Sequence, residues 1–155
     1  MKSKSSVALK QQLLELCQQA QAQRVEYARK AMEDAQQSAN QEERSTAGDK
    51  YDTSRAMSQN VRDMNAKQWQ EGLKDMALLQ QINPEPVSAH VRLGSVVKTT
   101  IGNYFIAISG GPYTIGKEKY FSVSPASPIG ELLLSKKTGE SFVFRDKQIL
   151  IAEVF

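Results

Sequence analysis

The chain has 155 residues and a net charge of +3, with 40% hydrophobic and 24% charged residues. This composition is typical of a folded globular protein and argues against wholesale disorder. No stretch approaches the roughly 20 apolar residues of a membrane-spanning helix, and the N-terminal segment lacks the apolar core of a signal peptide. We therefore expect a cytoplasmic protein without a membrane partner. Because there is no basic block, naked DNA or RNA is not an expected partner either.

The composition changes sharply after position 83. All five prolines and seven of the nine glycines follow it, whereas the preceding residues are rich in Gln, Ala, Glu and Lys. The two prolines of the segment NPEPVSAH would stop a helix and stiffen a short connection. The sequence therefore predicts a helical domain over residues 1–83, a linker over 84–90 and a second domain over 91–155.

Two stripes of small or apolar residues at helical spacing predict paired helices, and the first stripe follows alternating steps of four and three. The first stripe comprises Leu13, the only cysteine Cys17, Ala20, Arg24, Ala28, Ala31 and Ala35. The second comprises Met57, Val61, Met64, Trp69, Leu73, Met76 and Leu79. Each stripe is narrow, so one partner helix covers it better than a globular core does. We expect an antiparallel coiled-coil hairpin in which large side chains pack against small ones.

The segment between the stripes predicts the tip of this hairpin, near residues 45–56. Gly48 is a natural helix stop, and either Asp49 or Asp52 could cap the next helix. At the far end of a rod, these two carboxylates could instead share a cation such as Mg²⁺, which takes oxygen ligands and keeps several waters. Such a site is weak until a partner supplies further ligands. Both interpretations remain open from spacing alone.

From Val91 onward, short β-prone runs separated by Gly, Pro and charged residues predict a small, mostly antiparallel sheet. The runs are SVVKT, NYFIAIS, KYFSV, SFVFR and QILIAEVF. The segment SPIGELLLSKKTGE predicts one short helix, with Ser127 as its N-cap, Pro128 at its first position and Gly139 as its stop. The expected fold class is therefore α+β.

The sequence offers little evidence for catalysis by the chain itself. His90 is the only histidine, and no second histidine or cysteine stands near it, so we expect neither a zinc site nor a Ser-His or Cys-His nucleophile. The segment ISGGPYTIG lacks the spacing of a phosphate-binding loop and predicts a turn between strands.

Two segments resemble the Gre family of bacterial transcript-cleavage factors (GreA and GreB). The segment AGDKYDTSRAMSQ is similar to the family's tip motif, in which Gly-Asp is followed three residues later by a second acid; Asp49 and Asp52 occupy the two acidic positions. The segments VRLGSVV, NYFIAI, SVSPASPIGELLLSKKTGESFVF and ILIAEV follow the order of the family's FKBP-like domain, including its Ser-Pro loop. The resemblance covers nearly the whole chain.

The resemblance implies a regulator of transcription elongation that binds RNA polymerase as a monomer. The FKBP-like domain docks at the rim of the secondary channel, and the hairpin carries Asp49 and Asp52 toward the catalytic Mg²⁺ and the RNA 3′ end. There the two acids help to hold a second Mg²⁺, and the polymerase itself hydrolyses backtracked RNA. The protein is then not an enzyme and binds no cofactor alone. The residues implied in partner binding are Lys50, Tyr51, Arg55, Ser124, Pro125, Ser127 and Pro128.

The tip departs from the family pattern, which leaves alternatives open. Asp52 replaces the usual Glu, and residues 53–56 read Thr-Ser-Arg-Ala instead of Asn-Ala-Glu-Tyr. The shorter carboxylate reaches about one methylene less far, while Lys50 and Arg55 add positive charge that either opposes metal recruitment or grips RNA phosphate. One alternative is a channel modulator of the same fold that does not stimulate cleavage, and another is a coiled-coil adaptor with a structural tip. A peptidyl-prolyl isomerase is disfavoured because few aromatic residues are available to line a proline pocket.

Overall fold

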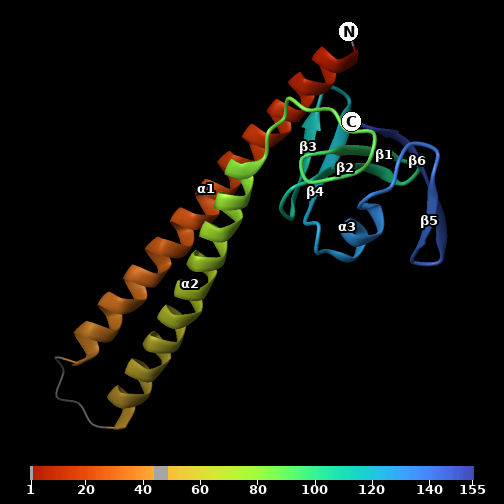
Figure 1. Cartoon of the computed structure of the whole chain (residues 1–155). Coiled ribbons are helices and arrows are strands. Elements are labelled where there is room, and N and C mark those ends of the chain that lie inside the picture. The colour runs from red at the N-terminus through yellow and green to blue at the C-terminus, as the bar shows by residue number, and fades with distance from the viewer. Residues whose placement is uncertain (1, 44–48) are drawn as a thin grey trace. The chain divides into compact units, whose positions relative to one another are not determined.

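The computed structural model describes the backbone of residues 2–43 and 49–155 and the side chains of residues 4–41 and 54–155. It contains long helices followed by a six-stranded mixed sheet with a short helix, which confirms the α+β class (Figure 1). The chain divides into two compact units. Unit 1 comprises residues 1–19 and 77–155, and unit 2 comprises residues 20–76. Within the described ranges, no helix is both long enough and apolar enough to cross a membrane.

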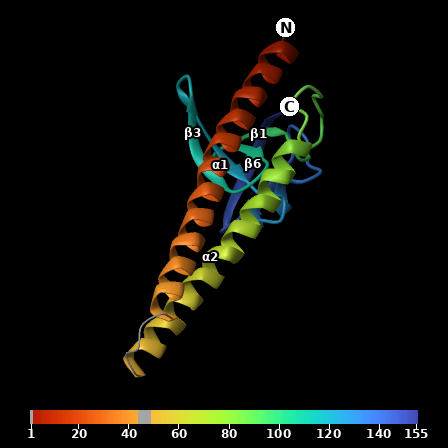
Figure 2. The same cartoon turned by 90° about the vertical axis from the view of Figure 1, so that its left-hand side faces the viewer.

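The long helices are α1 (Lys2–Glu43) and α2 (Asp49–Gln81). Both are rich in Ala, Gln, Glu and Lys, which lose little conformational freedom in a helix, and neither contains proline. In unit 2 the two helices lie side by side and run antiparallel (Figure 2). Gln21 contacts Gly72 while Gln36 contacts Arg62, so residue numbers fall along α2 as they rise along α1.

Small and polar side chains form the contact between the two helices of unit 2. Three alanines of α1 are buried: Ala28, Ala35 and Ala39. Gln21 is buried with them, and Asn65 is buried on α2. At Gly72 the helices approach closely, because a Cβ added there would stand 3.0 Å from Cγ2 of Val25. The expected small stripe on α1 is thus confirmed at Ala28 and Ala35.

The apolar stripe expected on α2 is wrong at four of its positions. Met57, Val61, Met64 and Leu73 are exposed. The buried and half-buried residues that recur at steps of four and three are instead Ser58, Arg62, Asn65, Trp69, Gly72 and Met76. Trp69 and Met76 belong to both sets, and the expected Leu79 is buried as well. The face of α2 that is turned inward therefore lies beside the row of Met57, Val61 and Met64, and it includes small and polar side chains.

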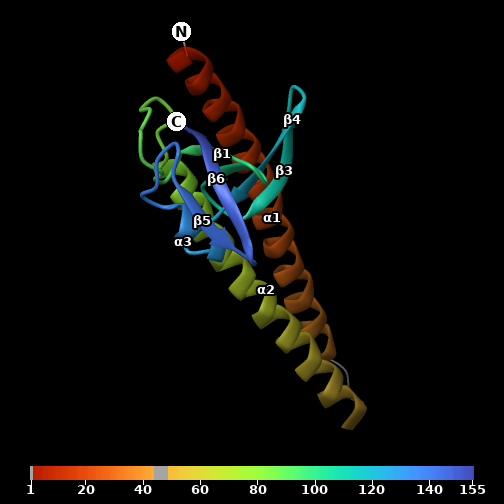
Figure 3. The same ribbon diagram turned by 90° about the vertical axis from the view of Figure 1, so that its right-hand side faces the viewer.

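Unit 1 is built on one mixed sheet. Its strands are β1 (Val96–Thr99), β2 (Gly102–Ile106), β3 (Gly110–Ile115), β4 (Glu118–Val123), β5 (Ser141–Phe144) and β6 (Lys147–Val154). Their spatial order is β3-β4-β2-β1-β6-β5, and every neighbouring pair is antiparallel except β2 with β4. Figure 3 shows β5 and β6 side by side. The five expected runs form five of these strands.

The remaining strand, β3, was expected as a turn, and that expectation is wrong for most of ISGGPYTIG. Residues 110–115 form an edge strand, while the turn follows at Gly116, whose φ is +64°. Glycine and proline weaken a central strand but are tolerated at a sheet edge, where one side of the backbone needs no partner strand. The glycines and proline of this segment therefore predicted a turn although the segment forms an edge strand.

The short helix α3 spans Pro128–Leu133. Its N-cap is Ser127, whose side chain accepts a hydrogen bond from the backbone N–H of Gly130, and Pro128 is its first residue, as expected. The helix ends before the expected stop at Gly139. That glycine instead has a φ of +90° in the connection to β5, a conformation that disfavours any side chain.

The sheet of unit 1 has a hydrophobic cluster on each face, because successive residues of a strand point to opposite sides. Val96 and Phe105 lie in one cluster, and their neighbours Val97 and Ile106 lie in the other together with Leu133 of α3. The first cluster also contains residues of both long helices, Leu13, Leu14, Cys17 and Leu79, together with Ile82 directly after α2. Both long helices therefore contribute to the core of unit 1.

The segment 84–90 is tied to α1 within unit 1. Lys10 is 2% exposed and donates a hydrogen bond of 2.7 Å from Nζ to the backbone oxygen of Pro86. Burial, followed by repulsion from Arg92, lowers the pKa of Lys10. This segment lies between the last residue of α2, Gln81, and the first strand, β1, and the buried Lys10 joins it to α1.

Candidate functional site

The two tip acids lie in the first turn of α2. The helix begins at Asp49, and Asp52 follows three residues later in the same helix. Side chains three positions apart on a helix share one face, and the N-terminus of a helix favours negative charge. The side chains of Asp49, Lys50, Tyr51 and Asp52 lie outside the described residues, as does Gly48 entirely. Both the shared cation and the capping role therefore stay predictions.

The described side chains contain no group of three or more His, Cys, Asp or Glu residues that could hold a metal ion. The side chains of Asp49 and Asp52 lie outside that set.

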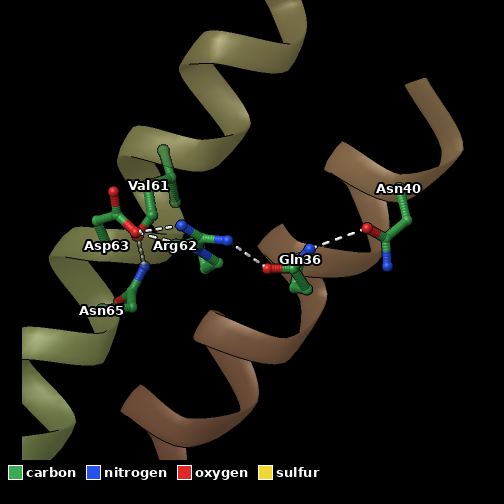
Figure 4. Close-up of polar contacts among 6 residues, drawn as sticks. All are labelled: Gln36, Asn40, Val61, Arg62, Asp63 and Asn65. Carbon is green, nitrogen blue, oxygen red and sulfur yellow. Dashed lines mark hydrogen bonds and ion pairs between the residues drawn. The ribbon is translucent and has the colours of Figure 1, made fainter. Parts of the chain in front are cut away.

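A side-chain hydrogen bond between Arg62 and Gln36 joins the two helices of unit 2 (Figure 4). Arg62 of α2 donates from Nη1 to Oε1 of Gln36 on α1 over 2.6 Å. The same guanidinium donates from Nε and Nη2 to Oδ1 of Asp63, at 3.0 and 2.6 Å. Gln36 in turn donates to Oδ1 of Asn40 over 2.9 Å. Arg62 thus joins the two helices through Gln36, and Asp63 balances its positive charge.

Arg55 lies on α2, nearer the tip than Arg62. Its side chain is half-buried. The structure therefore places Arg55 within two turns of Asp49, on the same element as Lys50, Tyr51 and Asp52. The predicted tip residues form one set at the start of a single helix.

The predicted loop residues Ser124, Pro125, Ser127 and Pro128 form a second set, between β4 and α3. Ser124 Oγ accepts a hydrogen bond from the backbone N–H of Ala126 over 3.1 Å. Its backbone oxygen accepts from the N–H and the hydroxyl of Ser127, at 3.0 and 2.6 Å. Both serines therefore hydrogen-bond inside the loop, while Ala126 and Pro128 are exposed.

Gly130 locks this loop onto α3. It is buried, and a Cβ at this position would overlap the backbone oxygen of Ser124 and stand 2.8 Å from Oγ of Ser127. Since nothing larger than hydrogen fits, the loop and the first turn of the helix are held in fixed register. A rigid loop presents the same surface to every partner and loses little entropy on binding.

A groove between the helices of unit 2 was not expected from the sequence. It has a volume of about 640 Å³, and its lining includes Arg24, Tyr27, Gln68, Glu71, Gly72 and Asp75. Burial and then the nearby Glu71 raise the pKa of Asp75, and Arg24 opposes that shift. The residues come from two segments far apart in the chain, so no local motif marks the groove. Its one sequence signal is Tyr27, an aromatic residue on a largely polar helix.

No protein-family model matches this chain, and no curated protein matches it. Any assignment of function therefore depends on the residues themselves and on their arrangement.

Proposed function

We propose that this protein is a Gre-like regulator of transcription elongation that inserts its helix pair into the secondary channel of bacterial RNA polymerase. The observation that carries the proposal is the antiparallel helix pair of unit 2, whose second helix, α2, contains Asp49 and Asp52 in its first described turn. In this proposal the two acids act from that end of the pair. The α2 part of unit 2, residues 49–76, is about 40 Å long at a rise of about 1.5 Å per residue. Two carboxylates at the end of such a pair could reach the catalytic Mg²⁺ through a narrow channel of the polymerase.

In this proposal unit 2 is an antiparallel coiled-coil hairpin, and the sheet with α3 is an FKBP-like docking domain. The buried alanines of α1 support close helix packing, and the spacing of the α2 contact residues fits a heptad pattern. The loop formed by Ser124, Pro125, Ser127 and Pro128 supports docking because its internal hydrogen bonds give it a fixed shape. Residues 91–155 bind the rim of the channel through this loop.

The tip acids provide oxygen ligands inside the polymerase. Asp49 and Asp52 complete the coordination of a Mg²⁺ shared with the polymerase active site, which supplies Lewis-acid activation of water when bound. Lys50, Tyr51 and Arg55 lie beside them along the chain and contact the RNA 3′ end or its surroundings. The protein therefore stimulates a reaction of the polymerase and is not itself an enzyme. It acts in the cytoplasm, as a monomer.

A non-cleaving modulator of the channel is the second candidate. The observation in its favour is Asp52, whose side chain is one methylene shorter than that of the family's usual glutamate, together with the positive charges of Lys50 and Arg55. Such a protein binds the channel and alters transcription without shortening RNA. The third candidate is an adaptor whose acids serve only the helix end.

Transcript cleavage in backtracked elongation complexes tests the proposal. We expect Mg²⁺-dependent shortening of the RNA with the wild-type chain, a loss of at least about tenfold in rate with Asp49→Asn or Asp52→Asn, and a gain with Asp52→Glu. Asp34→Asn, which changes an exposed carboxylate on α1, is the matched control and should leave the rate unchanged.

Binding to the polymerase is measured in parallel to separate the candidates. Tight binding with inhibition and no shortening would establish the non-cleaving modulator. A chain that does not bind the polymerase at all would overturn both and favour the adaptor.

A further inference from the structure

One flank of α2 carries apolar side chains that no element of unit 2 covers. Met57 is 64% exposed, Val61 is 45% exposed and Met64 is 54% exposed. They are four and three residues apart, so they form one row along the helix. They were expected to pack against α1, and their exposure leaves the row without a partner within unit 2.

The same row continues into the groove described above. At further steps of four, three and four it reaches Gln68, Glu71 and Asp75, all of which line the groove. The flank is therefore apolar in one half and acidic in the other. From Met57 to Asp75 it extends about 27 Å, or about five helical turns.

The first helix contributes to the acidic half. Tyr27 is 77% exposed and lines the groove together with Arg24. An exposed aromatic ring beside carboxylates is a favourable environment for a guanidinium or ammonium group, which gains from both the ring face and the negative charge. Because Arg24 balances one of the two carboxylates, one negative charge is left in excess.

We propose that this flank binds an amphipathic helix of a partner protein, whose apolar residues lie on Met57, Val61 and Met64 and whose Lys or Arg side chains enter the groove beside Glu71 and Asp75. The exposed apolar residues recur at steps of four and three beside a groove between two helices. A third helix with apolar residues at the same spacing can pack against such a row. This proposal does not depend on binding to RNA polymerase.

The electrostatics of the groove favour a basic occupant. The pKa of Asp75 is raised by burial and by the proximity of Glu71, which means that its negative charge is insufficiently compensated there. A cation in the groove would supply that compensation. The apolar half excludes a purely electrostatic ligand such as a nucleic acid, since three exposed large apolar side chains offer nothing to phosphate.

A second copy of this chain fits the flank poorly. If two copies met antiparallel through this row, Glu71 and Asp75 would face Met57 and Val61, and if they met parallel, carboxylates would face carboxylates. Either arrangement buries two acids per copy with Arg24 as the single cation of the groove lining, which is costly. The occupant must therefore bring its own basic residues.

Site-specific photocrosslinking in the cells that produce the protein tests the proposal. A photoreactive amino acid replaces Met64 in the full-length chain, and the crosslinked segment is identified by peptide mass spectrometry. Leu73, which is 43% exposed on the other side of the same helix, is the control position. We expect position 64 to crosslink a segment with apolar residues at helical spacing and Lys or Arg at one end, and position 73 not to crosslink it.

The second test measures, by fluorescence anisotropy, how tightly a synthetic peptide with the sequence of that segment binds the full-length chain. We expect Glu71→Lys with Asp75→Lys, and separately Met64→Asp, to weaken binding at least about tenfold, and Leu73→Gln to leave it unchanged within about twofold. The milder pair Glu71→Gln and Asp75→Asn serves if the charge reversal lowers helicity in circular dichroism. A crosslink to a second copy, to a segment without basic residues, or equally from both positions would overturn the proposal, as would peptide binding insensitive to these changes.

Discussion

Gln21 of α1 donates a hydrogen bond of 3.1 Å from Nε2 to the backbone oxygen of Gly72 on α2. Gln21 is only 3% exposed, so its amide is buried between the two helices, which approach closely at Gly72. The absence of a side chain at Gly72 is what lets the amide reach the backbone of the other helix. This contact fixes the register of the two helices of unit 2.

Replacing Gln21 tests whether this buried position holds a hydrogen-bond donor that faces a carbonyl oxygen. We expect Gln21→Leu to change the free energy of unfolding by about 1 kcal/mol or less, because one modest hydrogen bond is exchanged for apolar burial. Gln21→Glu should destabilise by about 3 kcal/mol at neutral pH, since it buries a carboxylate against a carbonyl oxygen. Burial raises the pKa of such an acid, so lowering the pH should restore part of the loss. Urea unfolding at two pH values measures both, and equal stability of the two variants would contradict the contact.

Gly130→Ala should be the most damaging single-methyl addition in unit 1. The added Cβ would overlap the Ser124 backbone oxygen, and neither the capped helix nor the loop can move away without breaking the Ser127 hydrogen bonds. We expect a loss of about 3 kcal/mol, measured by chemical denaturation. Glu131→Ala, at the next and exposed position of α3, is the control and should stay within about 0.5 kcal/mol.

Glu118 should contribute to the stability of unit 1 against acid. Its Oε2 accepts a hydrogen bond of 2.8 Å from the Tyr120 hydroxyl and lies 3.0 Å from Nζ of Lys98. The Tyr120 hydrogen bond first, and then Lys98, lower the pKa of Glu118 below its ordinary value of 4.5. The stabilisation is therefore fully present above about pH 4.5 and is lost as the pH falls through the lower folded-state pKa.

Glu118→Gln should remove this acid dependence. Because Glu118 is half exposed and screened by solvent, we expect an effect of about 1 kcal/mol or less. The difference in unfolding free energy between wild type and variant should narrow between about pH 5 and about pH 3. Glu131→Gln is the matched control, and an unchanged difference across that range would argue against the pairing.

Cys17 should be protected from thiol reagents in the native state. It is completely buried in the cluster that joins α1, α2 and the sheet within unit 1. A reagent can reach the thiol only when that core opens, so we expect labelling at least about a hundredfold slower than in denaturant. Rapid labelling under native conditions would show that the N-terminal part of α1 is not packed on the sheet.

The sequence predicted the elements of this fold better than their contacts. Ser127 was identified as a helix cap because a cap is a local arrangement within four residues. The side of α2 that faces α1 was misjudged, because Arg62 and Gly72 contact α1 through hydrogen bonds and, at Gly72, through close approach of the two helices. A pattern built on large apolar residues selects Met57, Val61 and Met64 instead, which are exposed.

Long-range pairing was also beyond the sequence. The parallel alignment of β2 with β4 joins strands that are separated by β3, and β3 itself contains the Gly-Gly-Pro that favoured a turn. The groove around Tyr27 and Asp75 depends on the register of two helices, which Gln21 and Gly72 fix. At the tip, local reasoning predicts a helix stop at Gly48 and a new helix near Asp49 and Asp52; both acids lie in α2, while Gly48 lies outside the described residues.

The packing of Leu13 and Phe155 in one cluster has a consequence for biosynthesis. As the chain emerges from the ribosome, Leu13, Leu14 and Cys17 are made early, but the first strand that packs with them, β1, follows about eighty residues later. Until β1, β2 and β4 exist, the beginning of α1 exposes an apolar surface to water that only a chaperone or a neighbouring nascent chain can shield. Translation that stalls before β4 would therefore leave an aggregation-prone product.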